Sequence, residues 1–335
     1  MKIEELKKWD KSEMYRIYDM WPEIARESYE DSLPKLDVSD IDHIVFAGMG
    51  GSGSVGDTIS AILSKKDIHV SIVKGYTLPK TVDSKTIVIT TSISGNTDET
   101  LEILKTANKS KAKVIGFASG GKMEAYCKNE DITFQQIPMI HSPRASFARF
   151  LYSILNVLEQ ILPIEKKEVL ESITTLQDIQ KEIFSGNLTS SNRALNLAEF
   201  TNDVTAIYYP RGFQSIAIRY KNCLQENSKI HAMTEDVIET CHNGIVSWEK
   251  QSVVKPVLIQ GKNDHEKTIE RWRILEEFFK EKQINYKKIF SIEGNILSKI
   301  VNLIYLLDYS TIYSAVLTNI DPSSIEPIKY VKSKL

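Results

Sequence analysis

Four hydroxyl side chains and a glycine follow an apolar stretch in the first third of the chain, an arrangement that suits phosphate binding. The apolar stretch is 86–90 (TIVIT), and it runs into the polar segment 92–100 (SISGNTDET). Backbone N–H groups at a helix N-terminus favour an anion, and hydroxyl groups can donate to its oxygens. An ordinary helix N-cap is the alternative reading of one such cluster. We expect Ser92, Ser94 and Thr97 to hold a phosphate monoester.

A glycine-rich turn at 48–53 (GMGGSG) also follows an apolar strand and precedes a helical run. It satisfies the G-x-G-x-x-G pattern, but a dinucleotide site needs an acidic residue after the next strand, where this chain has Lys74. Neither turn continues into the Gly-Lys-Ser/Thr of a P-loop. Two phosphate-type turns without a nucleotide feature indicate a small phosphorylated ligand, and we expect Gly51 and Ser52 to contact it.

The composition is that of a cytoplasmic enzyme rather than a nucleic-acid or membrane protein. The chain has 335 residues and a formal charge of −2, with acidic and basic residues well mixed. We expect no membrane-spanning run and no signal peptide, because the first residues are polar. Three cysteines, at 127, 223 and 241, lack metal-ligand spacing. We therefore expect no metal, no cofactor and no disulfide.

Alternating apolar strands and helical stretches predict an α/β fold with parallel sheets in two similar halves. A polar stretch at 187–192 reads as the linker between them. Strands are expected at 43–47, 69–73, 86–91 and 113–117, and again at 204–209, 229–233, 253–259 and 285–291. Helices are expected at 146–162, 169–183, 213–226, 264–282 and 294–318.

Five motifs, taken in order along the chain, carry a family resemblance. They are 48–53, 92–100, 142–145 (SPRA), 226–229 (ENSK) and 242–243 (HN). Together they resemble the motifs of the bifunctional phosphoglucose/phosphomannose isomerases. This resemblance implies two sugar isomerase (SIS) domains, each a doubly wound, mainly parallel five-stranded sheet flanked by helices. It also implies a homodimer, with active sites at or near the subunit interface.

The resemblance places the domain boundaries and the substrate. An N-terminal SIS domain would span 1–160 with its leading helices and the phosphate turns, a connecting helix and linker 161–192, and a C-terminal SIS domain 193–335. The substrate would be a hexose 6-phosphate.

An aldose–ketose isomerase must open the sugar ring and move a proton between neighbouring carbons through an enediol. A carboxylate can make that transfer. A glutamate at the end of an amphipathic helix is usually a solvated charge, but the resemblance of the 226–229 motif to the family makes Glu226 our candidate base. By resemblance, Arg144 faces the reacting carbons, where a guanidinium stabilises an enediolate oxygen. The resemblance also assigns His242 and Lys332 to ring opening, although the neighbouring Lys329 and Lys334 keep the choice of lysine open.

Two departures from the family pattern concern substrate preference. Phe147 stands close to the point where the family has a small glycine, and Gly244 stands where it has an acidic residue. Glucose 6-phosphate and mannose 6-phosphate differ only at C2, so these positions could favour one epimer. The alternatives are a SIS isomerase of another sugar phosphate, such as an amino sugar, and a regulator that binds sugar phosphates without catalysis.

Overall fold

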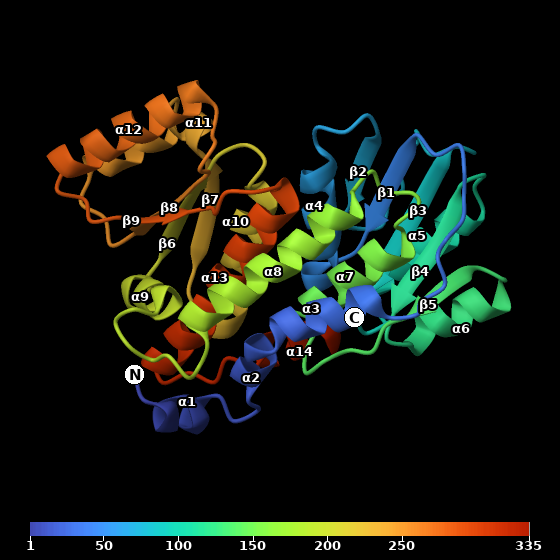
Figure 1. Cartoon of the computed structure of the whole chain (residues 1–335), viewed down its shortest axis with the longest axis horizontal. Coiled ribbons are helices and arrows are strands. Elements are labelled where there is room, and N and C mark those ends of the chain that lie inside the picture. The colour runs from blue at the N-terminus through green and yellow to red at the C-terminus, as the bar shows by residue number, and fades with distance from the viewer. Residues whose placement is uncertain (335) are drawn as a thin grey trace. The chain divides into compact units, whose positions relative to one another are not determined.

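The structure is a computed structural model that describes residues 1–334, and it divides into two compact units (Figure 1). The first unit comprises residues 20–173. The second unit comprises residues 1–19 together with the chain from Thr174 onward. Helix α8 (Lys166–Ile183) contains the boundary between them.

The first unit is built on a five-stranded parallel sheet with the order β2-β1-β3-β4-β5. The five strands expected for this sheet are confirmed. Four of them lie where the sequence placed them, to within one residue, whereas the short, polar fifth strand had been given no position. The strands are β1 (His43–Ala47), β2 (His69–Val73), β3 (Thr86–Ser92), β4 (Lys113–Ala118) and β5 (Thr133–Gln136).

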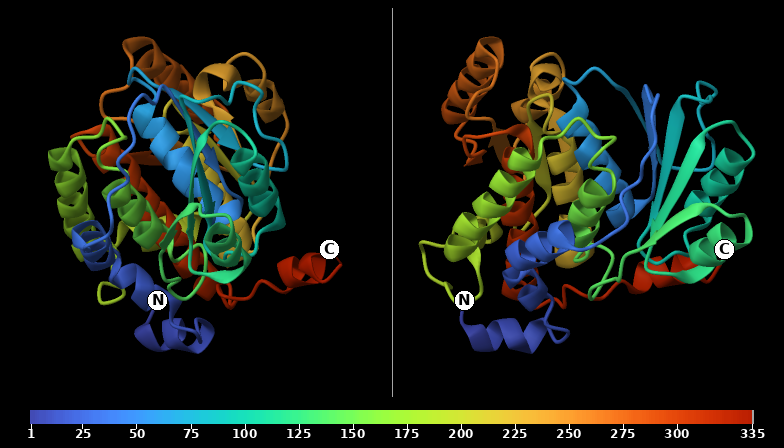
Figure 2. Two further views of the ribbon diagram at one scale, coloured as in Figure 1. Left: turned by 90° about the vertical axis from the view of Figure 1, so that its right-hand side faces the viewer. Right: turned by 45° about the vertical axis from the view of Figure 1, so that its right-hand side comes forward.

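Helices cover both faces of this sheet. Val45 of β1 packs with Ile103 of α5, whereas its neighbour Phe46 lies against Gly56 of α4. Successive strand residues point to opposite faces, so α4 and α5 lie on opposite sides, as the right-hand view of Figure 2 shows. The helices are α3 (Trp21–Glu30), α4 (Gly50–Leu63), α5 (Asp98–Asn108), α6 (Gly121–Asn129) and α7 (Phe147–Val157).

The strand order creates a switch point between β1 and β3. The chain leaves β1 through α4 towards β2 on one side, and leaves β3 through α5 towards β4 on the other. In open parallel sheets, ligands bind outside the carboxyl ends of the strands at this point. Both phosphate-type turns start there.

The second unit contains a four-stranded parallel sheet with the order β7-β6-β8-β9. The five strands expected here are therefore one too many within residues 1–334, because the chain after β9 enters a long buried helix instead of another strand. The α/β, doubly wound class itself is confirmed. The strands are β6 (Thr205–Tyr209), β7 (Ala232–Asp236), β8 (Lys255–Gln260) and β9 (Lys287–Phe290).

Helices also cover both faces of the second sheet (Figure 1). The α12 side chains Trp272, Leu275 and Phe279 form one core with Tyr208 and Leu258 of the sheet, and α10 packs on β6, β7 and α13. The helical elements are α1 (Ile3–Trp9), α2 (Met14–Asp19), α9 (Arg193–Phe200), α10 (Gln214–Cys223), a π-helix η1 (Leu224–Ser228), α11 (Val237–Thr240), a 3-10 helix η2 (Gly244–Glu249), α12 (Glu266–Glu281), α13 (Ile296–Leu317) and α14 (Glu326–Lys332).

The first nineteen residues pack with the second unit, whereas the sequence placed them in the N-terminal domain. The Tyr305 hydroxyl of α13 donates to the Tyr18 carbonyl at 2.6 Å. The Asp19 carboxylate accepts from the Tyr309 hydroxyl at 2.6 Å and from the Ser185 N–H at 2.9 Å. These partners lie more than a hundred residues away in sequence, so local patterns could not reveal them.

Helix α13 is long and apolar enough to span a membrane, which contradicts the expectation that no stretch of the chain would be. Its most apolar window is 94% buried inside the protein, as in the core helix of a globular unit. It also carries Asp308, which forms a fully buried ion pair with Arg219 of α10 at 2.5 Å. The helix is apolar because protein surrounds it on all sides.

We expect the stability of the protein to fall in mild acid because of a histidine pair at the start of β1 and β2. His43 is buried, and its ring centre lies 4.5 Å from that of His69. Burial, and then the neighbouring His69, lowers the pKa of His43 below its usual 6.5. The unfolded chain then binds protons below about pH 6.5 that the folded chain does not, so the free energy of unfolding falls as pH drops through that value.

Urea unfolding at pH 7.5 and pH 5.5 checks this expectation. The loss of stability in acid should be smaller in His43→Gln than in the wild-type protein. Equal losses in the two proteins would show that His43 makes no such contribution.

Candidate functional site

The glycine-rich turn lies at the switch point, between the end of β1 and the start of α4. Gly51 fits closely there, because a Cβ at this position would lie 3.1 Å from the Pro143 carbonyl oxygen. Ser52 is buried, and its Oγ accepts a hydrogen bond from the Ile93 N–H at 3.0 Å. Since Oγ acts as the acceptor in that bond, its own proton can be donated to a ligand.

The second turn connects β3 to α5 and brings its hydroxyls together. Ser92 Oγ donates to Thr97 Oγ1 at 3.0 Å, and Ser94 Oγ accepts from the Asn96 N–H at 3.3 Å. Thr97 is the N-cap residue of α5. Gly95 has a φ of 69° and packs directly on the Gly120 carbonyl, so a larger residue would strain this turn.

The bond between Ser52 and the Ile93 N–H joins the two turns into one cluster. Ile93 lies between Ser92 and Ser94, so all four predicted phosphate-binding hydroxyls share one edge of the sheet. The N-termini of α4 and α5 also start at this edge and add the positive ends of two helix dipoles. The arrangement suits a phosphate group without requiring a lysine.

Arg144 belongs to the same unit and is buried. Its backbone N lies 3.4 Å from the place that a Cβ at Gly51 would take. Ser146 closes the turn around it, accepting from the Ile140 N–H at 2.8 Å and donating to the Ser142 carbonyl at 2.9 Å. Ser146 was not among the predicted site residues, although its place as the N-cap of α7 was a usable signal.

Phe147 lies in the core of the first unit. Its side chain is 1% exposed and stacks on Trp21 of α3, with ring centres 5.9 Å apart. An aromatic residue at this position therefore fills the core between α3 and α7. This placement gives no support to the idea that Phe147 favours one epimer.

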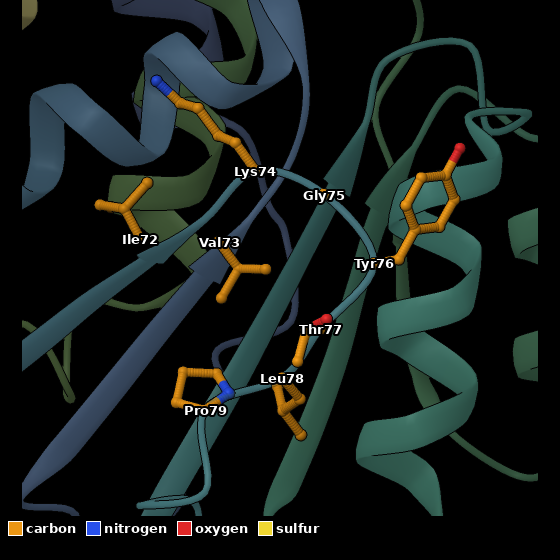
Figure 3. A pocket seen from close by; sticks show the side chains of 8 residues that line it. All are labelled: Ile72, Val73, Lys74, Gly75, Tyr76, Thr77, Leu78 and Pro79. Atoms are coloured by element: carbon orange, nitrogen blue, oxygen red, sulfur yellow. The ribbon is translucent and has the colours of Figure 1, made fainter.

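The connection that follows β2 borders a pocket of about 330 Å³ lined by 72–79 (Figure 3). Lys74 points towards α4, where its ammonium pairs with Asp57 at 2.5 Å. Its Cε lies 3.2 Å from the place of a Cβ at Gly53, so the pair adjoins the glycine-rich turn. At the end of β2, where a dinucleotide site has a carboxylate that binds the ribose, this protein has Lys74 in an ion pair with Asp57.

Glu226 belongs to the second unit and sits in the π-helix η1, partly exposed. Single π-helical turns are rare and are frequently found at functional sites. The two residues that follow fix this turn to α13: the Asn227 amide donates to Thr311 Oγ1 and the Ser228 hydroxyl to the Thr311 carbonyl, both at 2.8 Å. The expected apolar stripe of the preceding helix is buried, at Phe213, Ile216, Ala217, Tyr220 and Leu224.

His242 is exposed and follows α11, beyond the carboxyl end of β7. Glu226 lies before the amino end of the same strand, and a five-residue strand separates its two ends by about 13 Å. The structure therefore does not bring Glu226 and His242 of one chain together along this strand. Gly244, the second departure from the family pattern, packs directly on the carboxylate of Glu235.

Lys332 is exposed near the end of α14. The neighbouring Lys329 and Lys334 both have partners on α14. Lys329 pairs with Glu326 at 2.7 Å, and the ammonium of Lys334, which follows the helix, lies 5.8 Å from the Tyr330 ring centre. Lys332 stays the candidate that the sequence indicated.

Comparison with known proteins matches both halves of the chain to SIS families. Residues 37–161 match the SIS domain, and residues 190–335 match the bacterial phospho-glucose isomerase C-terminal SIS domain. The bifunctional phosphoglucose/phosphomannose isomerase of Caldicellulosiruptor bescii is 30% identical over 331 residues, which cover 95% of this chain and 97% of the relative. The chain belongs to the bifunctional phosphoglucose/phosphomannose isomerase family.

Other similarities agree with this family and its fold. The family member from Aquifex aeolicus is 28% identical, with 94% of each chain covered. The C-terminal domain of glucosamine-fructose-6-phosphate aminotransferase from Francisella tularensis superimposes with a TM-score of 0.71 at 18% identity, over 93% of this chain and 98% of that domain. The two SIS domains inferred from the motifs are therefore confirmed, as is the family.

Proposed function

We propose that this protein interconverts fructose 6-phosphate with glucose 6-phosphate and mannose 6-phosphate. The observation that carries the proposal is the cluster of hydroxyls at the switch point of the first sheet, which Ser52 joins to the Ile93 N–H. This cluster suits the phosphate of a sugar, and family membership supports the isomerase chemistry.

In the proposed reaction, the phosphate is held by Gly51 and the hydroxyls of Ser52, Ser92, Ser94 and Thr97. Glu226 moves the proton between C1 and C2, because a carboxylate near the substrate can both accept and return it. Arg144 stabilises the enediolate oxygen, and His242 and Lys332 assist ring opening.

We propose that the protein works as a homodimer and that His242 serves the site of the second copy. The support is the position of His242, at the other end of β7 from Glu226 in the same chain. We also propose a cytoplasmic location, since Cys127, Cys223 and Cys241 are thiols that a reducing compartment preserves.

Incubation of EDTA-treated protein with fructose 6-phosphate tests the activity when the product sugars are resolved. Glucose 6-phosphate and mannose 6-phosphate should both form, because they differ only at C2 and share one enediol with fructose 6-phosphate. EDTA should not abolish the activity, since the proposed base is a carboxylate and needs no metal. One product alone would restrict the proposal to one epimer. Neither product, from folded protein that binds the substrate, would favour another sugar phosphate or a regulator that only binds.

Ser52→Ala should raise KM for fructose 6-phosphate by about tenfold or more, with little change in kcat. A hydrogen bond to a charged phosphate contributes about 1.5 to 3 kcal/mol, and the phosphate is bound equally before and during the proton transfer. Steady-state kinetics checks this, with Ser60→Ala on the same helix as the control. An unchanged KM in Ser52→Ala would exclude this hydroxyl from phosphate binding.

A further inference from the structure

The segment that follows Glu226 is held in an unusual backbone conformation. The π-helix ends at Ser228, and the next residue, Lys229, has a φ of 58° and donates its backbone N–H to the Leu224 carbonyl. A left-handed conformation at a residue other than glycine costs about 1 kcal/mol or more, and it persists only where other contacts enforce it. The side chain of Lys229 makes such contacts.

The Lys229 ammonium lies among four backbone carbonyl oxygens. Those of Glu226 and Asn227 are 2.5 and 3.4 Å away, and those of Ser324 and Asp321 are 2.8 and 3.4 Å away. An ammonium group has three protons to donate, so carbonyls on several sides can share it. Two of these carbonyls belong to the turn that carries Glu226, and the other two belong to a segment some ninety residues later.

That later segment is the base of α14. The Ser323 N–H donates to the Asp321 carboxylate at 2.8 Å, which closes a turn, and α14 begins two residues after Ser324. None of the seven residues of α14 is buried. The position of this helix, and of Lys332 near its end, therefore depends on how its base is attached.

We propose that Lys229 is a positioning residue that joins the Glu226 turn to the base of α14. Its ammonium fixes the proposed base and the segment leading to Lys332 relative to each other. The catalytic part of this inference rests on the proposed isomerase function, whereas the attachment itself does not.

Lys229→Met tests the inference, because it keeps the length of the side chain and removes the donors. Hydrogen exchange of the amides in 321–333 should become faster than in the wild-type protein. With fructose 6-phosphate, kcat should fall by up to about 100-fold, as expected when catalytic groups are misplaced by about an ångström. KM should stay near the wild-type value, because the phosphate contacts are in the other unit.

Three further variants separate positioning from general damage. Lys229→Arg keeps a cation with several donors, and it should regain slow exchange and much of the lost kcat. Glu226→Gln should lose activity while 321–333 exchanges as in the wild type. Lys267→Met removes an exposed lysine of the same unit and should change neither property. If Lys229→Met does not fold, Lys229→Gln takes its place with fewer donors.

The outcomes distinguish this inference from the proposed function. If the wild-type protein isomerises and Lys229→Met matches it in exchange and kcat, the positioning role is overturned and the isomerase stands. Faster exchange in Lys229→Met with an unchanged kcat would overturn the claim that Lys229 positions the catalytic groups, and would leave the attachment of α14 in place. If the wild-type protein forms neither glucose 6-phosphate nor mannose 6-phosphate, the isomerase function and the catalytic role of Lys229 are both overturned. The exchange rates of 321–333 then test only whether Lys229 attaches α14.

Discussion

Glu226→Gln should lower kcat for fructose 6-phosphate isomerisation by about 10²- to 10⁴-fold, the usual contribution of a positioned acid–base group. Glutamine has nearly the same size and can still accept a hydrogen bond, but it cannot take up and return the proton. KM should change little, since the phosphate contacts do not involve Glu226. Substrate binding by calorimetry and turnover by a coupled assay provide the two readouts.

Glu281→Gln is the matched control, because it removes a carboxylate from the exposed end of α12 in the same unit. It should have wild-type kinetics. If Glu226→Gln retained wild-type kcat, another group would have to be the base. If neither the wild-type protein nor the variant turned over a substrate that both bind, the protein would be a binder of sugar phosphates.

The periodic parts of the fold could be predicted from the sequence. The β1 and β3 strands are buried along their whole length, so they appear as continuous apolar runs, and the turns after them carry the glycines and hydroxyls that their geometry needs. The clustering of Ser52 with the hydroxyls after β3 was predictable for the same reason. Parallel strands end at one edge of a sheet, so residues that follow two neighbouring strands must meet there.

The region around Glu226 was less predictable, because tertiary contacts override its local pattern. The sequence predicts a helix to residue 226 and a strand at 229–233, but the α-helix ends at Cys223 and β7 begins at Ala232. A π-helix and the left-handed Lys229 occupy the residues between. Their causes are bonds to Thr311 and to the base of α14, some eighty to ninety-five residues away.

Arg219→Met should destabilise the protein by about 3 to 5 kcal/mol, because it leaves the carboxylate of Asp308 buried without its partner charge. The two side chains are 2% and 0% exposed, and the guanidinium donates to Asp308 Oδ2 from Nε at 2.9 Å and from Nη2 at 2.5 Å. Urea unfolding at pH 7.5 measures the loss. Arg273→Met is the control, since its ion pair with Glu277 is exposed and should contribute about 0 to 1 kcal/mol.

The double variant Arg219→Met/Asp308→Leu separates the contribution of the buried pair to stability from its contribution to catalysis. Apolar replacement of both partners is often neutral, so it should recover most of the stability that Arg219→Met loses. Stability alone then does not explain the pair. Arg219 lies on α10, which leads into the Glu226 turn, and Asp308 lies one helical turn before Thr311, which binds that turn. We therefore expect the double variant to fold well and still have a reduced kcat, and a wild-type kcat would limit the pair to a structural role.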